Sequence, residues 1–166
     1  YMPKGCIIYC IEGGILEKYT LLSIVSIREF GGFLNEYDIF CVQPRKEFPI
    51  TKSARTKLET FNVNIIEKSL NIRHRYYPIL NKPLAISYIM KHHEYDQYIF
   101  LDSDTIILNE TVNFLKTSSE ICLSTVYTNG IGIHSLEDNY ATYWDQLFKL
   151  AKAETSHLAR TKTRIE

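Results

Sequence analysis

The chain has 166 residues, of which 45% are hydrophobic and 23% charged, and nineteen Lys and Arg balance nineteen Asp and Glu. This composition excludes disordered and collagen-like classes, and a net charge of zero disfavours a globally basic nucleic-acid-binding protein. No apolar run approaches the roughly 18 residues that a membrane span needs, and we expect a single domain over residues 1–166.

The four cysteines lie inside apolar runs and form no C-x-x-C pair; they are Cys6, Cys10, Cys41 and Cys122. Buried, reduced thiols fit this pattern better than zinc ligands do. The N-terminus has no basic segment followed by a long apolar stretch, so the sequence predicts no signal peptide. These features together predict a cytoplasmic protein.

The first half of the chain predicts strands that alternate with helices. Gly31 and Gly32 stop the first helix, as glycines do at helix C-termini. The predicted elements are, in order, a strand over Gly5–Ile11, a helix over Ile15–Phe30, a strand over Tyr37–Val42, a helix over Thr51–Phe61, a strand over Val63–Glu67 and a loop over Asn71–Tyr77. The helical spacing in the first helix comes from Leu16, Tyr19, Leu22, Val25 and Ser26.

In the second half, Asn81 is placed to cap a helix that begins with Lys82 and Pro83. Strands are predicted over Gln97–Leu101 and Ile121–Tyr127, with a tight turn at Asn129 and Gly130. The clearest helical pattern follows at Tyr140, Tyr143, Trp144, Leu147, Phe148 and Ala151. We expect its aromatic face to pack on the sheet or against a second copy in a homodimer, and residues 152–166 to form a frayed tail.

This alternation predicts an α/β fold with a Rossmann-like, mostly parallel sheet and helices on both faces. Ligands bind at the carboxyl ends of the strands in such sheets. That rule selects three places in this chain, namely Glu12–Gly14, Pro44–Arg45 and Asp102–Asp104. Arg45 could reach a phosphate bidentately from the second of these places, although a solvated surface arginine fits as well.

Asp102 and Asp104 flank Ser103 directly after an apolar strand. Two carboxylates at this spacing on a tight turn can reach one divalent cation, and hard oxygen ligands suit Mg²⁺ or Mn²⁺. Alternatively, the two aspartates only form an Asx turn. The position of the triplet after about a hundred residues of alternating strands and helices favours the metal-binding interpretation.

Residues 95–105, with this D-x-D triplet, resemble the corresponding segment of GT-A-fold glycosyltransferases. Asn81 and Lys82 resemble the helix start that precedes that strand in the same superfamily, and the segment Cys10–Gly13 is similar to the one that cradles the nucleotide base. The resemblance covers about residues 5–130. It implies a GT-A-like enzyme that transfers a sugar from a nucleotide-diphosphate sugar donor, with Mn²⁺ or Mg²⁺, to an acceptor that the sequence does not identify.

The resemblance also implies roles for individual residues. Asp104 would ligate the metal directly, Asp102 would ligate it or hold the ribose, and Lys82 would approach the donor phosphates or ribose. The full set of implied donor contacts is Cys10, Ile11, Glu12, Asn81, Lys82, Asp102 and Ser103. No residue of this chain matches a catalytic base or a third metal ligand, and the chain is shorter than GT-A transferases usually are.

Two other functions stay open from the sequence. A non-catalytic nucleotide-sugar-binding or interaction module fits the short chain. A haloacid-dehalogenase-type phosphatase also places D-x-D after a strand, with the first Asp as nucleophile. In that family, however, Gly-Thr normally follows the motif, whereas Thr105 and Ile106 follow it here.

Arg73, His74 and Arg75 precede Tyr76 and Tyr77 and make a local basic cluster with aromatic neighbours. This segment is either an anion-binding loop or a solvated loop, and the sequence favours the second interpretation.

Overall fold

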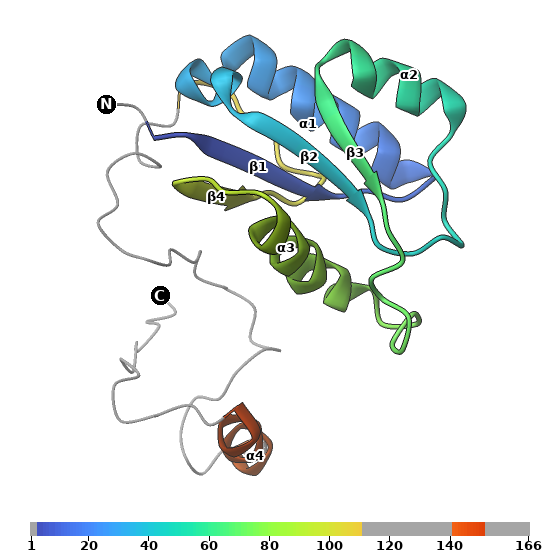
Figure 1. Ribbon diagram of the computed structural model, residues 1–166, viewed down its shortest axis with the longest axis vertical. Coiled ribbons are helices and arrows are strands. Elements are labelled where there is room, and N and C mark those ends of the chain that lie inside the picture. Colours follow the sequence, from blue (N-terminus) through green and yellow to red (C-terminus); the bar gives the residue numbers. More distant parts are fainter. Residues whose placement is uncertain (1–2, 111–140, 152–166) are drawn as a thin grey trace, which may run out of the picture. The chain divides into compact units, whose positions relative to one another are not determined.

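The computed structural model describes residues 3–110 and 141–151, which belong to two separate units, Tyr1–Thr117 and Ser118–Glu166 (Figure 1). In the second unit a helix, α4 (Ala141–Ala151), confirms the predicted helix. The predicted strand over Ile121–Tyr127, the turn at Asn129 and Gly130 and the tail over 152–166 lie outside the described residues, and the structure does not describe the packing of the Trp144 side chain. The single domain and the homodimer stay predictions.

The first unit contains four strands and three α-helices within its described residues, close to the predicted bounds. The strands are β1 (Gly5–Cys10), β2 (Asp38–Gln43), β3 (Val63–Glu67) and β4 (Gln97–Phe100). The α-helices are α1 (Ile15–Phe30), α2 (Lys52–Thr60) and α3 (Asn81–His92), and short 3₁₀ turns cover Gly32–Glu36 and Pro78–Leu80. No helix in the described part of the chain is long and apolar enough to cross a membrane.

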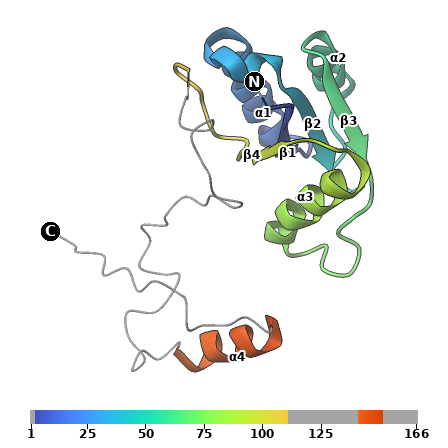
Figure 2. The same cartoon turned by 60° about the vertical axis from the view of Figure 1, so that its left-hand side comes forward.

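The four strands form one parallel sheet in the order β3-β2-β1-β4, which confirms the predicted α/β fold class. The chain moves outward from β1 to β2 and β3 and then returns to place β4 on the other side of β1. Because crossovers between parallel strands keep one hand, this reversal puts the connecting helices on opposite faces. Helices α1 and α2 cover one face and α3 covers the other (Figures 1 and 2).

Alternating residues of the central strands build a hydrophobic core on each face of the sheet. On the α1 and α2 face, Ile7, Tyr9 and Ile39 pack with Ile24, Ile27 and Leu58. On the α3 face, Cys6, Ile8, Phe40 and Val42 pack with Ala85 and Ile89. Burial of a parallel sheet on both faces accounts for the nearly continuous apolar runs in β1 and β2. Cys6 and Cys41 are buried, Cys10 is partly buried, and Cys122 lies outside the described residues.

The face of α1 that packs against the core differs from the face that the spacing of its apolar residues predicts. Leu16, Tyr19 and Leu22 are exposed. The buried positions are Glu17, Thr20, Ser23, Ile24, Ser26 and Ile27. Four of these six residues are polar, so apolar periodicity alone does not locate the buried face.

The polar residues on the buried face of α1 are paired with other parts of the fold. The Ser23 and Tyr9 hydroxyl oxygens lie 2.6 Å apart, and Glu17 accepts a hydrogen bond from the Thr51 backbone N–H at 2.8 Å. The Ser26 hydroxyl oxygen accepts from the Ile107 N–H at 2.9 Å. Hydrogen bonds remove most of the cost of burying such groups, which explains how α1 packs a polar face inward.

The start of α3 also differs from the prediction. Asn81 is the first residue of the helix rather than its cap, and the backbone at the cap position, Leu80, is helical as well. The Asn81 side chain makes no capping bond and points instead toward Glu12 and Asn71. Tertiary partners therefore override the local capping preference of asparagine.

The assignment of the α1 faces can be tested with a matched pair of substitutions. Ile24→Ala should destabilise the protein by about 2–5 kcal/mol, because Ile24 is fully buried and its truncation leaves a cavity. Leu22→Ala should change stability by less than about 0.5 kcal/mol, because Leu22 is exposed on the same helix. Urea unfolding of both variants measures the difference, and equal losses would contradict the assignment.

Candidate functional site

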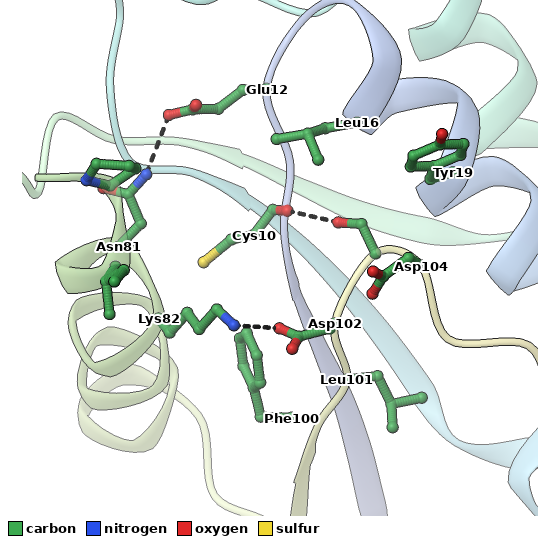
Figure 3. A pocket seen from close by; sticks show the side chains of 13 residues that line it. Cys10, Glu12, Leu16, Tyr19, Asn81, Lys82, Phe100, Leu101, Asp102 and Asp104 are labelled. Carbon is green, nitrogen blue, oxygen red and sulfur yellow. Dashed lines mark hydrogen bonds and ion pairs between the residues drawn. The ribbon is translucent and has the colours of Figure 1, made fainter. Parts of the chain in front are cut away.

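A pocket of about 360 Å³ opens at the carboxyl ends of β1 and β4 (Figure 3). Strand order reverses at this point, so the chain leaves β1 and β4 toward opposite faces of the sheet and a crevice opens between the two connections. The lining residues come from the ends of β1 and β4, from α1, from the 3₁₀ turn Pro78–Leu80 and from the start of α3. They are Cys10, Glu12, Leu16, Tyr19, Pro78, Ile79, Asn81, Lys82, Phe100, Leu101, Asp102, Ser103 and Asp104.

The D-x-D triplet forms a tight turn at the end of β4, closed by a 3.0 Å hydrogen bond from the Thr105 N–H to the Asp102 carbonyl. The Ser103 hydroxyl donates to the Cys10 carbonyl at 3.1 Å, and the Thr20 hydroxyl donates to the Ser103 oxygen at 3.1 Å. Ser103 therefore ties the turn to β1 and α1. The carboxylates on either side of it are exposed and line the pocket.

The two carboxylates of this turn differ in their partners. Asp102 Oδ1 lies 2.6 Å from Lys82 Nζ, and both side chains are about half exposed, at 51% and 44%. Figure 3 shows these two groups pointing toward one another across the pocket. Asp104 makes no hydrogen bond or ion pair with any residue in the described ranges 3–110 and 141–151. The pocket thus holds one carboxylate paired with a lysine and a second one available to a ligand.

Glu12, two residues after the end of β1, is held in a buried polar cluster. Its carboxylate accepts hydrogen bonds from Arg45 Nε at 2.6 Å, from Arg45 Nη2 and from Asn81 Nδ2 at 3.1 Å. Asn81 Oδ1 in turn accepts from Asn71 Nδ2 at 2.9 Å. Protein donors therefore engage both Glu12 oxygens, and the cluster joins the end of β1 to the start of α3, where Lys82 follows Asn81.

Arg45 and Ile11 are not among the residues that line the pocket. The Arg45 guanidinium is engaged by Glu12, by the Arg75 carbonyl at 2.7 Å and by the Phe48 ring, whose centroid lies 4.3 Å away. Hydrogen bonding to Glu12 also raises the pKa of Arg45. Ile11 is fully buried, with its N–H bonded to the Val42 carbonyl at 2.9 Å. Neither side chain is available to a ligand in this conformation.

Cys10 lines the pocket, and burial raises the pKa of its thiol to about 12, with Glu12 acting in the same direction. Because the thiolate is the reactive form of cysteine, a thiol with this pKa is not a nucleophile near neutral pH. Cys10 is therefore a wall of the pocket rather than a reactive group.

The residues present can hold a divalent metal only in part. Among the described residues, no group of three or more His, Cys, Asp or Glu side chains lies close enough to form a metal site. Asp102 and Asp104 offer hard oxygen ligands that line one pocket. Mg²⁺ is commonly held by one or two carboxylates together with substrate phosphates and water, so the donor set fits a metal that arrives with a phosphorylated ligand.

Sequence reasoning did not identify Thr20 and Asn71, although both hold parts of the site. Thr20 contacts Ser103, and Asn71 contacts Asn81. The available signal for Thr20 was the row of polar residues at Glu17, Thr20 and Ser23. Their spacing of three residues marks one side of a helix. Nothing comparable in the sequence distinguishes Asn71 from an ordinary loop asparagine.

Comparison with known proteins gives one family match. The family model of the Rhodobacterales glycosyltransferase domain matches residues 7–165, which include all the residues that line the pocket. No curated protein matches the chain.

The buried Glu12–Arg45 pair provides a test of the cluster. Glu12→Ala should cost about 3–5 kcal/mol of stability, because it leaves the Arg45 guanidinium, only 10% exposed, without its counter-charge. The exposed Arg55–Glu67 pair is a matched control, and Glu67→Ala should cost less than about 1 kcal/mol. Urea unfolding measures both. A similar cost for the two variants would show that the Glu12 pair contributes no more than a surface ion pair.

Proposed function

Because the chain belongs to the Rhodobacterales glycosyltransferase domain family, we propose that it transfers a sugar from a nucleotide-diphosphate sugar bound in the pocket between β1 and β4. The observation that carries this proposal is the meeting of Lys82, Asp102 and Asp104 in that one pocket. A lysine at a helix start and two carboxylates are groups that recognise a metal-bound diphosphate. The parallel sheet and the D-x-D turn after β4 support a GT-A-like fold.

Asp102 and Asp104 would hold a Mn²⁺ or Mg²⁺ ion together with the donor diphosphate. When bound, such an ion acts as a Lewis acid that stabilises the negative charge of the departing nucleoside diphosphate. Lys82 would then leave Asp102 and donate to a phosphate oxygen, where the N-terminal dipole of α3 adds to its charge. Cys10 and Glu12 would form the wall beside the nucleotide base, and Ile11 could contribute only through its backbone.

A donor-binding module without transfer is the second candidate, and one observation favours it. The carboxylates that line the pocket are Glu12, Asp102 and Asp104. Glu12 is bonded to protein donors and the other two are assigned to the metal, so the described part of the pocket offers no separate carboxylate as a general base. Donor turnover in the presence of candidate acceptors distinguishes an enzyme from such a module. The glycosyltransferase family match favours either of these over a phosphatase.

Asp104→Asn tests the metal site. It should abolish the Mn²⁺-dependent part of nucleoside diphosphate binding, because an amide is a poorer metal ligand than a carboxylate, and it should leave the melting temperature nearly unchanged because Asp104 is exposed. A thermal-shift screen of UDP, GDP, ADP and CDP selects the nucleotide. Calorimetric titration with and without Mn²⁺ then measures its affinity for both proteins. Binding of the nucleotide that is independent of Mn²⁺ in the wild type would refute the proposed site.

Lys82→Met tests the exchange of partners at Asp102. Removal of the lysine should increase the affinity for Mn²⁺ alone by about two- to fivefold, because the metal no longer displaces a half-exposed ion pair. The same change should weaken binding of the Mn²⁺–nucleotide complex, because the phosphates lose a cation. Lys57→Met, on α2, removes an equal charge from an exposed position and serves as the control. A parallel loss of affinity for metal and nucleotide would contradict the exchange.

A further inference from the structure

The basic residues of this electrically neutral chain are unevenly distributed. Residues 68–93, which run from the end of β3 through α3, contain five of the nineteen Lys and Arg and none of the nineteen Asp and Glu. The five are Lys68, Arg73, Arg75, Lys82 and Lys91. Among the elements that the structure describes in the first unit, α3 covers the face of the sheet opposite α1 and α2, so this acid-free stretch of sequence includes the helix of that face (Figures 1 and 2).

The loop that precedes α3 adds large apolar side chains to this charge. Ile72 is 71% exposed and Tyr76 is 85% exposed, and Tyr77 and Ile79 are also exposed. Figure 1 shows the loop as a turn that projects beyond the N-terminal end of α3. Four large apolar residues exposed within eight positions form an unusual patch for a protein surface. We call residues 72–79 the tip loop.

The basic side chains of the tip loop stay largely available for a partner. Arg75 stacks on the Tyr76 ring at 4.9 Å, and its ion pair with Glu47 is long, at 3.8 Å, and half exposed. Arg73 makes no ion pair with any residue that the structure describes. Lys46 and Phe48, from the neighbouring loop that contains Glu47, are exposed as well. The tip loop therefore presents aromatic and aliphatic groups together with guanidinium groups that are weakly neutralised.

We infer that the tip loop and the adjoining part of α3 dock this protein onto a lipid bilayer that carries anionic headgroups. Transfer of exposed Tyr and Ile side chains from water to the boundary between headgroups and acyl chains is favourable, and nearby Lys and Arg are attracted to anionic lipids. A projecting tip suits a fluid surface that deforms around it, whereas a rigid protein partner would need a matching cavity. Free phosphate would satisfy the guanidinium groups but not the apolar residues.

Docking would also place the pocket near the lipid surface. Pro78 and Ile79 belong to the tip loop and line the pocket at the same time. This surface goes beyond the proposed glycosyl transfer and does not depend on it, because none of the docking residues ligates the proposed metal. The Asp104→Asn variant should therefore bind vesicles as the wild type does, even where nucleotide binding is lost.

Vesicle co-sedimentation of the full chain tests the inference. The wild type should sediment with vesicles of phosphatidylcholine and phosphatidylglycerol, but not with phosphatidylcholine alone, and added salt should weaken the binding. The double variant Arg73→Ser, Arg75→Ser should lose about tenfold or more in affinity, since each basic residue near an anionic surface contributes about a fivefold factor. Ile72→Ser combined with Tyr76→Ser should cause a similar loss.

Two control variants match these changes on the opposite face of the sheet. Lys52→Ser with Lys57→Ser removes two charges from α2, and Leu22→Ser with Phe30→Ser removes two exposed apolar residues from α1. Both should retain binding within about twofold, and circular dichroism confirms that every variant is folded. Losses in the controls equal to those in the tip loop, or no wild-type binding to anionic vesicles, would overturn the inference. Wild-type affinity in the apolar double variant, or displacement by millimolar glycerol phosphate, would show that the loop binds a free anion instead.

Discussion

The buried ion pair between Glu12 and Arg45 is the interaction on which the candidate site depends. It joins the end of β1 to the segment after β2, and the Glu12 carboxylate extends the connection to Asn81 at the start of α3. An uncompensated charge at this depth would be unfavourable, so the two side chains hold each other in one geometry. The start of α3 is thereby fixed beside the pocket, and Lys82 reaches Asp102 from a defined backbone position. Gly13, the residue after Glu12, lets the chain after β1 pass close to the Pro49 backbone, because a Cβ at this position would lie 2.3 Å from the Pro49 carbonyl oxygen.

Topology explains why this cluster and the D-x-D turn meet. The strand order places β4 beside β1, although almost ninety residues separate the two strands in the sequence. Parallel pairing brings their carboxyl ends to the same edge of the sheet. Ser103 then closes the junction through the Cys10 carbonyl, and Ile107 returns to α1 through the Ser26 hydroxyl. The acidic turn is thus anchored on both sides while its carboxylates stay exposed.

The strands, helices and fold class could be predicted from the sequence because apolar periodicity, glycines and strand-end polar residues are local signals. The position of Asp102–Asp104 at a strand end followed from the same signals. The buried face of α1 could not be predicted, because Thr20, Ser23 and Ser26 are buried through partners that lie on other elements. The capping prediction for Asn81 is wrong for a related reason: the sequence signal for a cap is local, whereas the Asn81 side chain bonds to Glu12, sixty-nine residues away.

The two ion pairs near the pocket differ in burial, and this difference separates structure from chemistry. The Glu12 and Arg45 side chains are 8% and 10% exposed, so breaking their pair would leave a charge in a poorly solvated position. The Asp102 and Lys82 side chains are about half exposed, so water replaces each partner at a cost below about 1 kcal/mol. The first pair would therefore persist when the proposed donor binds, and it would keep the start of α3 beside the end of β1. The second pair would open when a cation reaches Asp102 and an anion reaches Lys82, which is what the proposed metal-bound diphosphate would bring. If both pairs were buried, Asp102 and Lys82 could not exchange each other for a cation and an anion. If both pairs were exposed, the start of α3 would not be fixed, and Lys82 would not be held beside Asp102.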